Sequence, residues 1–284
     1  MEKLNPKAIY TIAKKEFLDN IRNKWVILLT FLFVILIVVF SYVAGGQSGG
    51  GKTFGNMQNT VIGLVSISSI LIPLIAIILG FSTISGEAES GALYVVLSYP
   101  VRRLEVLLGK LLGLGSVIIV STFLGFGLGG IVIAATVGTE AWAGYIAFIL
   151  LSIFLGFIYL SLSICISAYC KRRITSIGGG LLVFFWNMIY GTILMAILFA
   201  TGSNIGNLMK GNIPEWFYNS VIFSPSDLHQ TAVQRAFGIS TIEAMRIKVT
   251  IPEFLSMSTL LVVHIIWFVV PLILAYFFFK RRDI

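Results

Sequence analysis

Six long apolar segments constrain this chain more than any other feature, because each is long enough to cross a lipid bilayer as a helix. They lie at residues 25–44, 61–84, 111–137, 142–169, 177–200 and 259–279. The first has about 20 residues, against about 7–15 for a signal-peptide core, so we expect it to be retained as a span. Soluble domains carry about 25% charged residues, whereas this chain of 284 residues carries 11%. We therefore expect an all-α, polytopic membrane protein, with a single six-span domain over residues 1–284.

The basic residues are distributed unevenly between the two sides that six spans define. Both termini fall on one side, and 15 of the 20 Lys and Arg residues lie there. Positive charge marks the cytoplasmic side of a membrane protein, so we expect both termini in the cytoplasm and residues 202–258 outside the cell membrane. Because topology accounts for the net charge of +8, nucleic acid is not an expected partner.

Residues 5–24 precede the first span and predict an amphipathic helix. Asn5 is a typical N-cap and Pro6 a typical first helical residue. Apolar side chains then recur every three or four residues, with charged side chains between them. Such a basic amphipathic helix lies in the headgroup plane, beside the bilayer. The pattern fits a simple membrane anchor and an elbow helix that contacts a partner equally well.

The linker between the second and third spans, residues 84–110, predicts a folded, charged element. Pro100 divides it into two short amphipathic pieces, and its charged residues are Glu87, Glu89, Arg102, Arg103, Glu105 and Lys110. Most linkers between helices are only a few residues long, so we interpret this one as a docking element on the inner side. Glu87 and Glu89 either form the acidic first turn of a helix or accept hydrogen bonds from Arg or Lys of a docked protein.

The long outer segment, residues 202–258, also predicts structure. Trp216 and its aromatic neighbours suit a membrane interface, and Ser224 and Pro225 begin a short amphipathic helix. We expect two or three short helices packed on the outer mouth of the bundle. They either cap the bundle or serve as a gate or platform for an extracytoplasmic partner.

The sequence contains no pattern typical of catalysis or metal binding. The residues from Gly46 to Thr53 match the phosphate-loop pattern, but a span precedes them where a strand would be needed. Cys165 and Cys170 are the only cysteines and lack metal-ligand spacing. His264 is the one titratable residue well inside a span, which argues against an ion-coupled carrier. We therefore expect no cofactor on this chain, no catalytic residues and an external source of energy.

Glycines in the third span include Gly125 and Gly129 at the spacing that lets helix backbones approach closely in lipid. They predict either close packing within the bundle or an interface between subunits.

The charged linker resembles the signature of the type-2 ABC transporter permeases. The matching motifs are I-S-G-E-x-E-x-G-x-L from Ile84, L-S-x-P-V-x-R from Leu97, and G-K-L-L-G from Gly109. The resemblance extends along nearly the whole chain. The outer segment, with Ser224 to Asp227, is most similar to permeases of nitrous-oxide-reductase maturation systems.

This resemblance implies a pair of permease chains, most simply a homodimer, with two cytoplasmic ATPase subunits that bind the ATP and Mg²⁺. It implies a coupling helix within residues 86–100, assisted by the elbow helix. The residues expected at the ATPase interface are Lys14, Lys15, Glu16, Gly86, Glu87, Glu89, Ser90, Gly91, Pro100, Arg102 and Arg103.

The main hypothesis is therefore a non-enzymatic permease subunit of an ATP-driven exporter. On this hypothesis, replacing Glu87 and Glu89 by Lys should uncouple ATP hydrolysis from transport and leave the fold intact. The alternative is a non-transporting scaffold that passes conformational change from an ATPase to an outer partner.

Overall fold

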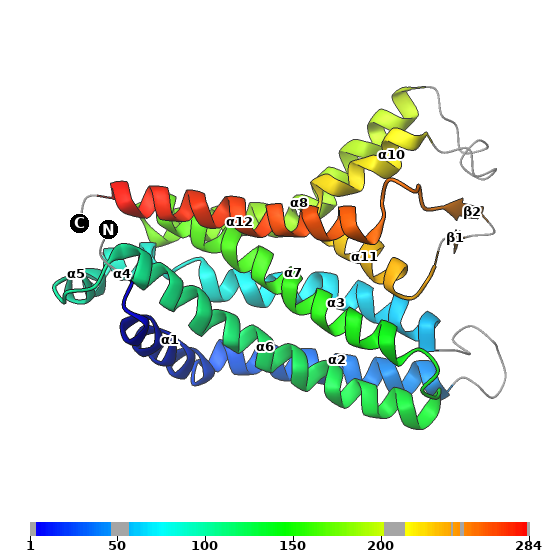
Figure 1. The fold of residues 1–284 in the computed structure, drawn as a ribbon, viewed down its shortest axis with the longest axis horizontal. Helices are drawn as coiled ribbons and strands as arrows, with labels where there is room; N and C mark the ends of the chain where they lie inside the picture. The colour runs from blue at the N-terminus through cyan, green and yellow to red at the C-terminus, as the bar shows by residue number, and fades with distance from the viewer. Residues whose placement is uncertain (1–3, 47–56, 202–213, 240, 245–246, 283–284) are drawn as a thin grey trace.

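The computed structural model describes residues 4–46, 57–201, 214–239, 241–244 and 247–282, and these form a bundle of long helices (Figure 1). Six helices are long and apolar enough to cross a membrane. They are α2 (Lys24–Gly46), α3 (Met57–Gly80), α6 (Arg103–Thr136), α7 (Trp142–Tyr169), α8 (Arg173–Ala200) and α12 (Met257–Arg281). The predicted helical class and the six spans are thus confirmed. The phosphate-loop-like residues 47–53 lie outside the described part of the chain.

The N-terminal helix α1 (Pro6–Ile21) begins where the capping signal predicts. The Asn5 side-chain oxygen accepts hydrogen bonds from the backbone N–H groups of Lys7 and Ala8, and Pro6 occupies the first turn. Helix α1 packs against the first part of α6. At Gly113 of α6, an added Cβ atom would lie 2.5 Å from the carbonyl oxygen of Ala13. Only glycine therefore permits this close approach of the two backbones.

Helix α6 is longer than the span that the sequence predicts. It begins at Arg103 instead of Leu111 and contains 34 residues, which corresponds to about 51 Å at 1.5 Å per residue. The hydrocarbon core of a bilayer is only about 30 Å thick. Residues 103–110, which the sequence assigned to the docking element, thus continue the third span without a break.

The glycine pair in α6 serves packing within this chain. A Cβ atom at Gly125 would clash with the ring of Phe33, and one at Gly129 would lie 2.6 Å from Ile37 Cγ2, both on α2. Behind this contact, the ring of Phe126 meets Phe33 edge-on, with the ring centroids 5.3 Å apart. Of the two readings left open by the sequence, the structure shows close packing between α2 and α6.

The segment before α12 forms several short elements at one end of the bundle (Figure 1). They are α10 (Glu215–Asn219), the 3₁₀ turn η2 (Ser220–Phe223), α11 (Pro225–Ala236), β1 (Thr241–Ala244) and β2 (Ile247–Thr250). Helix α11 packs mainly against α7 and α12, as expected of a helix on the mouth of the bundle. The strands form an antiparallel hairpin in which Thr241 pairs with Thr250, an element that the sequence analysis did not predict.

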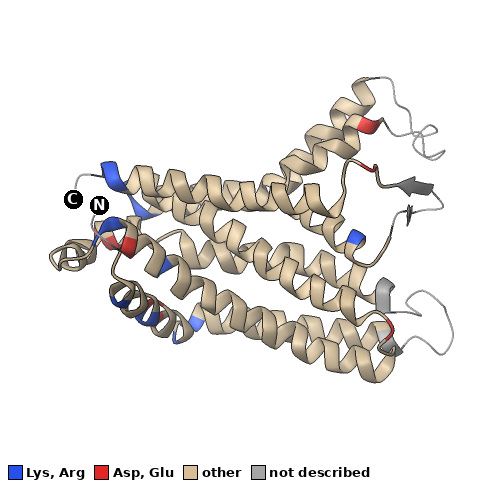
Figure 2. Ribbon diagram, viewed as in Figure 1, with Lys and Arg blue, Asp and Glu red and all other residues tan. Residues whose placement is uncertain are grey.

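The charged side chains gather at the opposite end. Figure 2 shows most of the Lys and Arg residues near the two termini, on α1 and at the ends of α6 and α12. We call this the basic end and the end that carries α11 the far end. The short helices α4 (Ser85–Glu89) and α5 (Ala92–Leu97) also lie at the basic end (Figure 1).

Candidate functional site

The docking element of the sequence analysis folds as a pair of short helices, α4 and α5, at the basic end. Gly91 joins them in the left-handed region, with φ of 78°, which costs glycine little and other residues more. In Figure 1 this turn projects beyond the ends of the long helices. Tyr94, Val95 and Tyr99 are exposed large side chains on it. The element therefore presents exposed apolar and aromatic side chains at the basic end.

The base of α4 is held by hydrogen bonds to α7. The Ser167 hydroxyl oxygen accepts from the backbone N–H groups of Ile84 and Ser85, at 3.0 Å each. On the neighbouring helix α8, the Ser176 hydroxyl donates to the carbonyl oxygen of Phe81. These buried contacts satisfy the backbone where α3 ends and α4 begins. They fix α4 to the ends of two spans.

A buried ion cluster joins α1, α4 and α6; it consists of Lys15, Glu16, Glu87 and Lys110. The Lys110 ammonium lies 2.7 Å from Glu87 Oε1 and 2.8 Å from Glu16 Oε1, and its side chain is 2% exposed. Lys15 lies 3.3 Å from Glu16 and 3.7 Å from Glu87, at the solvent-facing side of the cluster. Two positive and two negative charges thus balance. The cluster links three elements that are far apart in the sequence.

The electrostatic environment of Lys15 follows from this arrangement. Partial burial acts to lower the pKa of the Lys15 ammonium, but the carboxylates of Glu16, Glu87 and Asp19 outweigh it and raise the pKa above its ordinary value. Lys15 therefore remains charged at neutral pH. The second oxygen of Glu87, Oε2, is buried and has no hydrogen-bond partner among the described residues.

Glu89 makes a different contact. Its Oε2 accepts a hydrogen bond of 2.8 Å from the backbone N–H of Arg173, in the first turn of α8. A carboxylate is favourable there because the first N–H groups of a helix lack partners within the helix. Glu89 thus ties α4 to the start of the fifth span.

These contacts bear on one expectation about Glu87 and Glu89. Both carboxylates have partners within the chain, because Glu87 pairs with Lys110 and Glu89 accepts a hydrogen bond from the start of α8. For Glu87, the ion pair with Lys110 argues against the expectation that replacing both by Lys leaves the fold intact. A lysine there would face the buried ammonium of Lys110, and Glu16 alone would remain to compensate the two positive charges.

The other predicted interface residues divide into anchored and exposed groups. The Arg103 guanidinium donates to three carbonyl oxygens at the end of α12, at 2.6–2.9 Å. The backbone N–H of Arg102 donates to Glu105, which closes the first turn of α6. Gly86 is partly buried beside Ser82. Lys14, Ser90 and Pro100 are exposed at the surface of the basic end, as are Lys15 and Glu89.

Two functional contacts were missed by the sequence analysis. Lys110 was counted as a cytoplasmic charge, although its place in an otherwise apolar helical stretch could have indicated a buried partner. Arg282, near the C-terminus, donates to carbonyl oxygens of Ser167, Ala168, Cys170 and Lys171 at 2.9–3.3 Å. It caps the end of α7. Arg103 and Arg282 together join α6, α7 and α12 at the basic end.

A second polar region lies at the far end, around α11. The Tyr159 hydroxyl contacts the Ser226 hydroxyl at 2.8 Å, and the Ser152 hydroxyl lies 3.5 Å from His229 Nε2. With its amide turned to donate, Asn187 lies 2.9 Å from a carboxylate oxygen of Asp227. These contacts anchor α11 to α7 and α8. Within the described ranges, no three His, Cys, Asp or Glu side chains come together as a metal site.

Comparisons with known proteins agree with this arrangement. A family model described as ABC-2 family transporter protein matches residues 10–284. The chain is 32% identical to a probable ABC transporter permease protein NosY of Pseudomonas aeruginosa, over 98% of this chain and 99% of that one. It is 28% identical to the protein of the same description from Stutzerimonas stutzeri, over 96% of this chain and 98% of the other. The chain therefore belongs to the ABC-2 transporter family, as a multi-pass membrane permease subunit of an ABC transporter.

Proposed function

We propose that this permease couples ATP hydrolysis by a separate ATPase subunit to the export of a substrate across the cell membrane. The observation that carries the proposal is the buried ion cluster. It ties α4 to both α1 and α6, so a displacement of α4 moves an N-terminal helix and a complete span together. A docked subunit that pushes on α4 and α5 would thereby act on the bundle.

The orientation of the chain follows from the same proposal. The basic end lies in the cytoplasm, with both termini, because 15 of the 20 Lys and Arg residues fall on that side. The far end, with α10 and α11, lies outside. ATP and Mg²⁺ bind to the partner ATPase, and this chain supplies the surface that the ATPase contacts.

The surface that contacts the ATPase consists of exposed side chains on α5 and the turn that follows, together with Lys14 on α1. Tyr94, Val95 and Tyr99 are each more than half exposed, and large aromatic side chains dominate the binding energy of protein interfaces. Glu87 and Glu89 act by positioning α4. Glu16 and Lys15 act in the same way from α1.

A second copy of the permease completes the assembly. Helix α8 leans away from the other spans in Figure 1 and buries few of its residues within the chain. Its uncovered face includes Leu181, Phe185 and Met188, beside Gly178, at which an added Cβ atom would meet nothing within 4 Å. Small and large side chains of this kind favour helix association in lipid. We place the dimer contact, and the substrate path beside it, along α8.

The proposal is tested by isolating the tagged full-length permease from native membranes, together with any ATPase that accompanies it. Replacing Tyr99 by Ala should weaken the association by about fivefold or more, because loss of an interface tyrosine costs more than about 1 kcal/mol. Tyr42→Ala is the matched control, since Tyr42 is 66% exposed and Tyr99 65% but Tyr42 lies near the far end of α2. Equal retention of the ATPase by both variants, or no ATPase at all, would refute the proposal.

A scaffold that serves an outer partner is the second candidate, and the far-end segment favours it. Trp216 and Phe223 are exposed there, next to an α11 that is firmly anchored to α7 and α12. Transport of a defined solute into sealed vesicles, driven by ATP, supports the exporter. ATP-dependent binding of an outer protein without solute movement supports the scaffold.

A further inference from the structure

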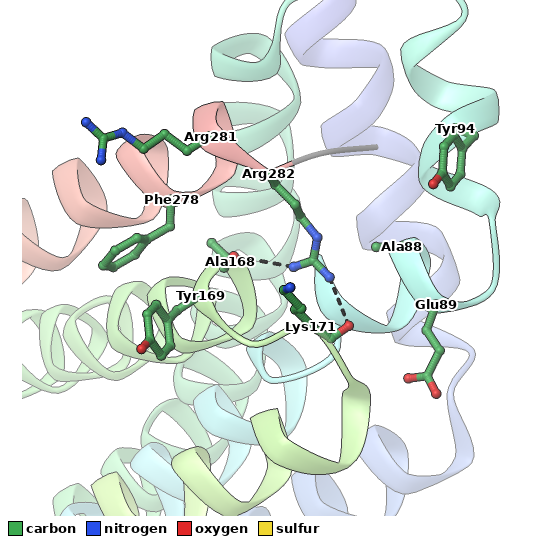
Figure 3. Close-up of a pocket in the computed structure, with 9 residues that line it drawn as sticks. All are labelled: Ala88, Glu89, Tyr94, Ala168, Tyr169, Lys171, Phe278, Arg281 and Arg282. Carbon is green, nitrogen blue, oxygen red and sulfur yellow. Dashed lines mark hydrogen bonds between the residues drawn. The ribbon is translucent and has the colours of Figure 1, made fainter.

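A pocket of about 430 Å³ lies at the basic end, beside the coupling element. Helices α4 and α5 form one wall, and the ends of α7 and α12 form the other. Its charged and aromatic lining includes Tyr94, Tyr169, Lys171, Phe278, Arg281 and Arg282. Figure 3 shows Arg282 reaching from the end of α12 into the space between the α7–α8 turn and the coupling element. Tyr94 also belongs to the surface proposed above for the ATPase, but the space itself has no role in the functions assigned above.

The charges that line the pocket are mostly positive, and the described residues do not neutralise them. In the described part of the chain, Lys171, Arg281 and Arg282 form no ion pair with a carboxylate. Glu89 is the acidic residue of the lining, and its Oε2 accepts the backbone N–H of Arg173. Figure 3 shows the Glu89 carboxylate pointing away from Arg282. The pocket therefore favours an anionic occupant.

Arg282 is held in place before any ligand arrives. Its guanidinium donates to four carbonyl oxygens at the end of α7, so its side chain is already ordered. Lys171, which is exposed on the α7–α8 turn, supplies a movable ammonium opposite it. A fixed guanidinium and a flexible ammonium suit the oxygens of a phosphate group.

An apolar strip leads from the pocket along α12, toward the middle of the bundle. Val270, Leu274 and Phe278 follow one another at intervals of four residues, and therefore lie on one face of the helix. Val270 is 47% and Leu274 43% exposed. Phe278 packs edge-on against Tyr169, with ring centroids 5.0 Å apart, at the level where aromatic side chains mark a membrane interface. The basic pocket thus continues into a surface suited to acyl chains.

We infer that this pocket binds the headgroup of an anionic phospholipid from the leaflet at the basic end, with the acyl chains along α12. Basic pockets between spans are known to hold such headgroups. The continuous apolar strip favours a lipid over an acidic side chain of a docked protein, because a protein side chain would leave that strip unused. The headgroup would touch α4 and α5 directly, and would hold the coupling element against α12.

The test uses the full-length permease, stripped of lipid in detergent and titrated with phosphatidylglycerol or phosphatidylcholine, with bound lipid counted by native mass spectrometry. Lys171→Gln with Arg281→Gln removes the charges of two residues that line the pocket. The Arg281 side chain points outward in Figure 3, and its guanidinium lies 3.9 Å from the centroid of the Phe277 ring. Arg172→Gln with Lys280→Gln removes two charges from exposed residues next to them in the sequence, which do not line the pocket. Arg282 is left unchanged because it also caps α7.

We expect phosphatidylglycerol to bind more tightly than phosphatidylcholine, and the pocket variant to lose affinity by about 25-fold, at about fivefold for each basic residue. The neighbouring variant should keep its affinity. Equal losses in the two variants would refute the site. Competition by glycerol phosphate at the same concentration as the lipid would instead indicate a soluble phosphate ligand and refute the lipid. Weaker binding of the ATPase to the lipid-free pocket variant would identify a protein contact, and would also overturn the inference.

Discussion

Replacing Lys110 by Met tests the buried ion cluster directly. Methionine keeps most of the volume and the straight chain of lysine, so the packing of α6 against α1 changes little. The substitution removes the ammonium that lies between Glu16 and Glu87, at 2.8 and 2.7 Å. The two carboxylates then remain in a region where the side chain of Glu16 is 7% exposed.

The expected cost follows from this burial. Removing one partner of a buried ion pair costs about 3–5 kcal/mol, because the remaining charge keeps its desolvation penalty and loses its compensation. Lys110 compensates two carboxylates, so we expect a loss in the upper part of that range. Lys15 also contacts Glu16, but its side chain is 55% exposed, and exposed pairs contribute about 0–1 kcal/mol. It therefore compensates the remaining carboxylates only weakly.

The free energy of unfolding can be measured by denaturant titration of the purified permease in mixed micelles. Lys15→Met is the matched control, since it removes the same type of residue from the same cluster and should cost less than about 1 kcal/mol. A triple variant with Glu16→Gln, Glu87→Gln and Lys110→Met leaves no uncompensated buried charge in the cluster, because the exposed Lys15 keeps Asp19 at 3.3 Å. It should recover most of the lost stability.

Two results would refute this reasoning. If Lys110→Met cost no more than Lys15→Met, the cluster would not be buried in the protein in its micelle. If the triple variant were as unstable as Lys110→Met, the loss would come from packing and not from uncompensated charge.

Three further predictions concern other contacts of the fold. Gly113→Ala should detach α1 from α6 because of the clash with Ala13, and increase proteolysis of α1, whereas Gly127→Ala should have no effect because nothing lies within 4 Å of an added Cβ there. Glu105→Ala should lower the thermal stability by about 1 kcal/mol through loss of the cap on α6, and an unchanged melting temperature would contradict that role. Burial, with a smaller effect from the other histidine, lowers the pKa of His229 to about 3, whereas an unfolded chain binds this proton below about pH 6.5. Stability should therefore fall by about 1 kcal/mol between pH 7.5 and 5.5, and His229→Gln should remove that part of the pH dependence in thermal unfolding.

The sequence predicts the number and class of the helices because long apolar segments have few other stable structures in a membrane. The start of α1 is also predictable, since Asn5 and Pro6 are local capping signals. The start of α6 is harder to predict from the sequence. Arg103 and Glu105 look like linker residues, but Glu105 accepts hydrogen bonds from the N–H groups of Asn5 and Arg102, and the first of these partners lies 100 residues away.

The sequence predicts where the charged element lies along the chain but not its internal contacts, and the docking role of this element stays a prediction. The motifs placed Glu87 and Glu89 in a docking element, and the structure shows this element as α4 and α5 at the basic end. Their partners, Lys110 and the backbone of Arg173, depend on how three or more helices meet. The spacing of residues along one helix does not show which residues of other helices they will contact. The hairpin of β1 and β2 was missed because each strand has only four residues, so the alternation of polar and apolar residues is too brief to indicate a strand.

The unbroken length of α6 has a mechanical consequence. Helix α6 has 34 residues from Arg103 to Thr136 and is about 51 Å long. Because no break divides it, a rotation of one end tilts the whole helix and is not taken up by a hinge in its middle. An inclination of ten degrees, taken as an illustration, would shift its opposite tip by about 9 Å if the pivot lay at one extremity. A small movement of α6 beside Lys110 would thus also move Phe126 on the same helix. Phe126 would in turn displace Tyr145 on α7, whose hydroxyl donates to the carbonyl oxygen of Phe126. No intermediate conformational change would be needed.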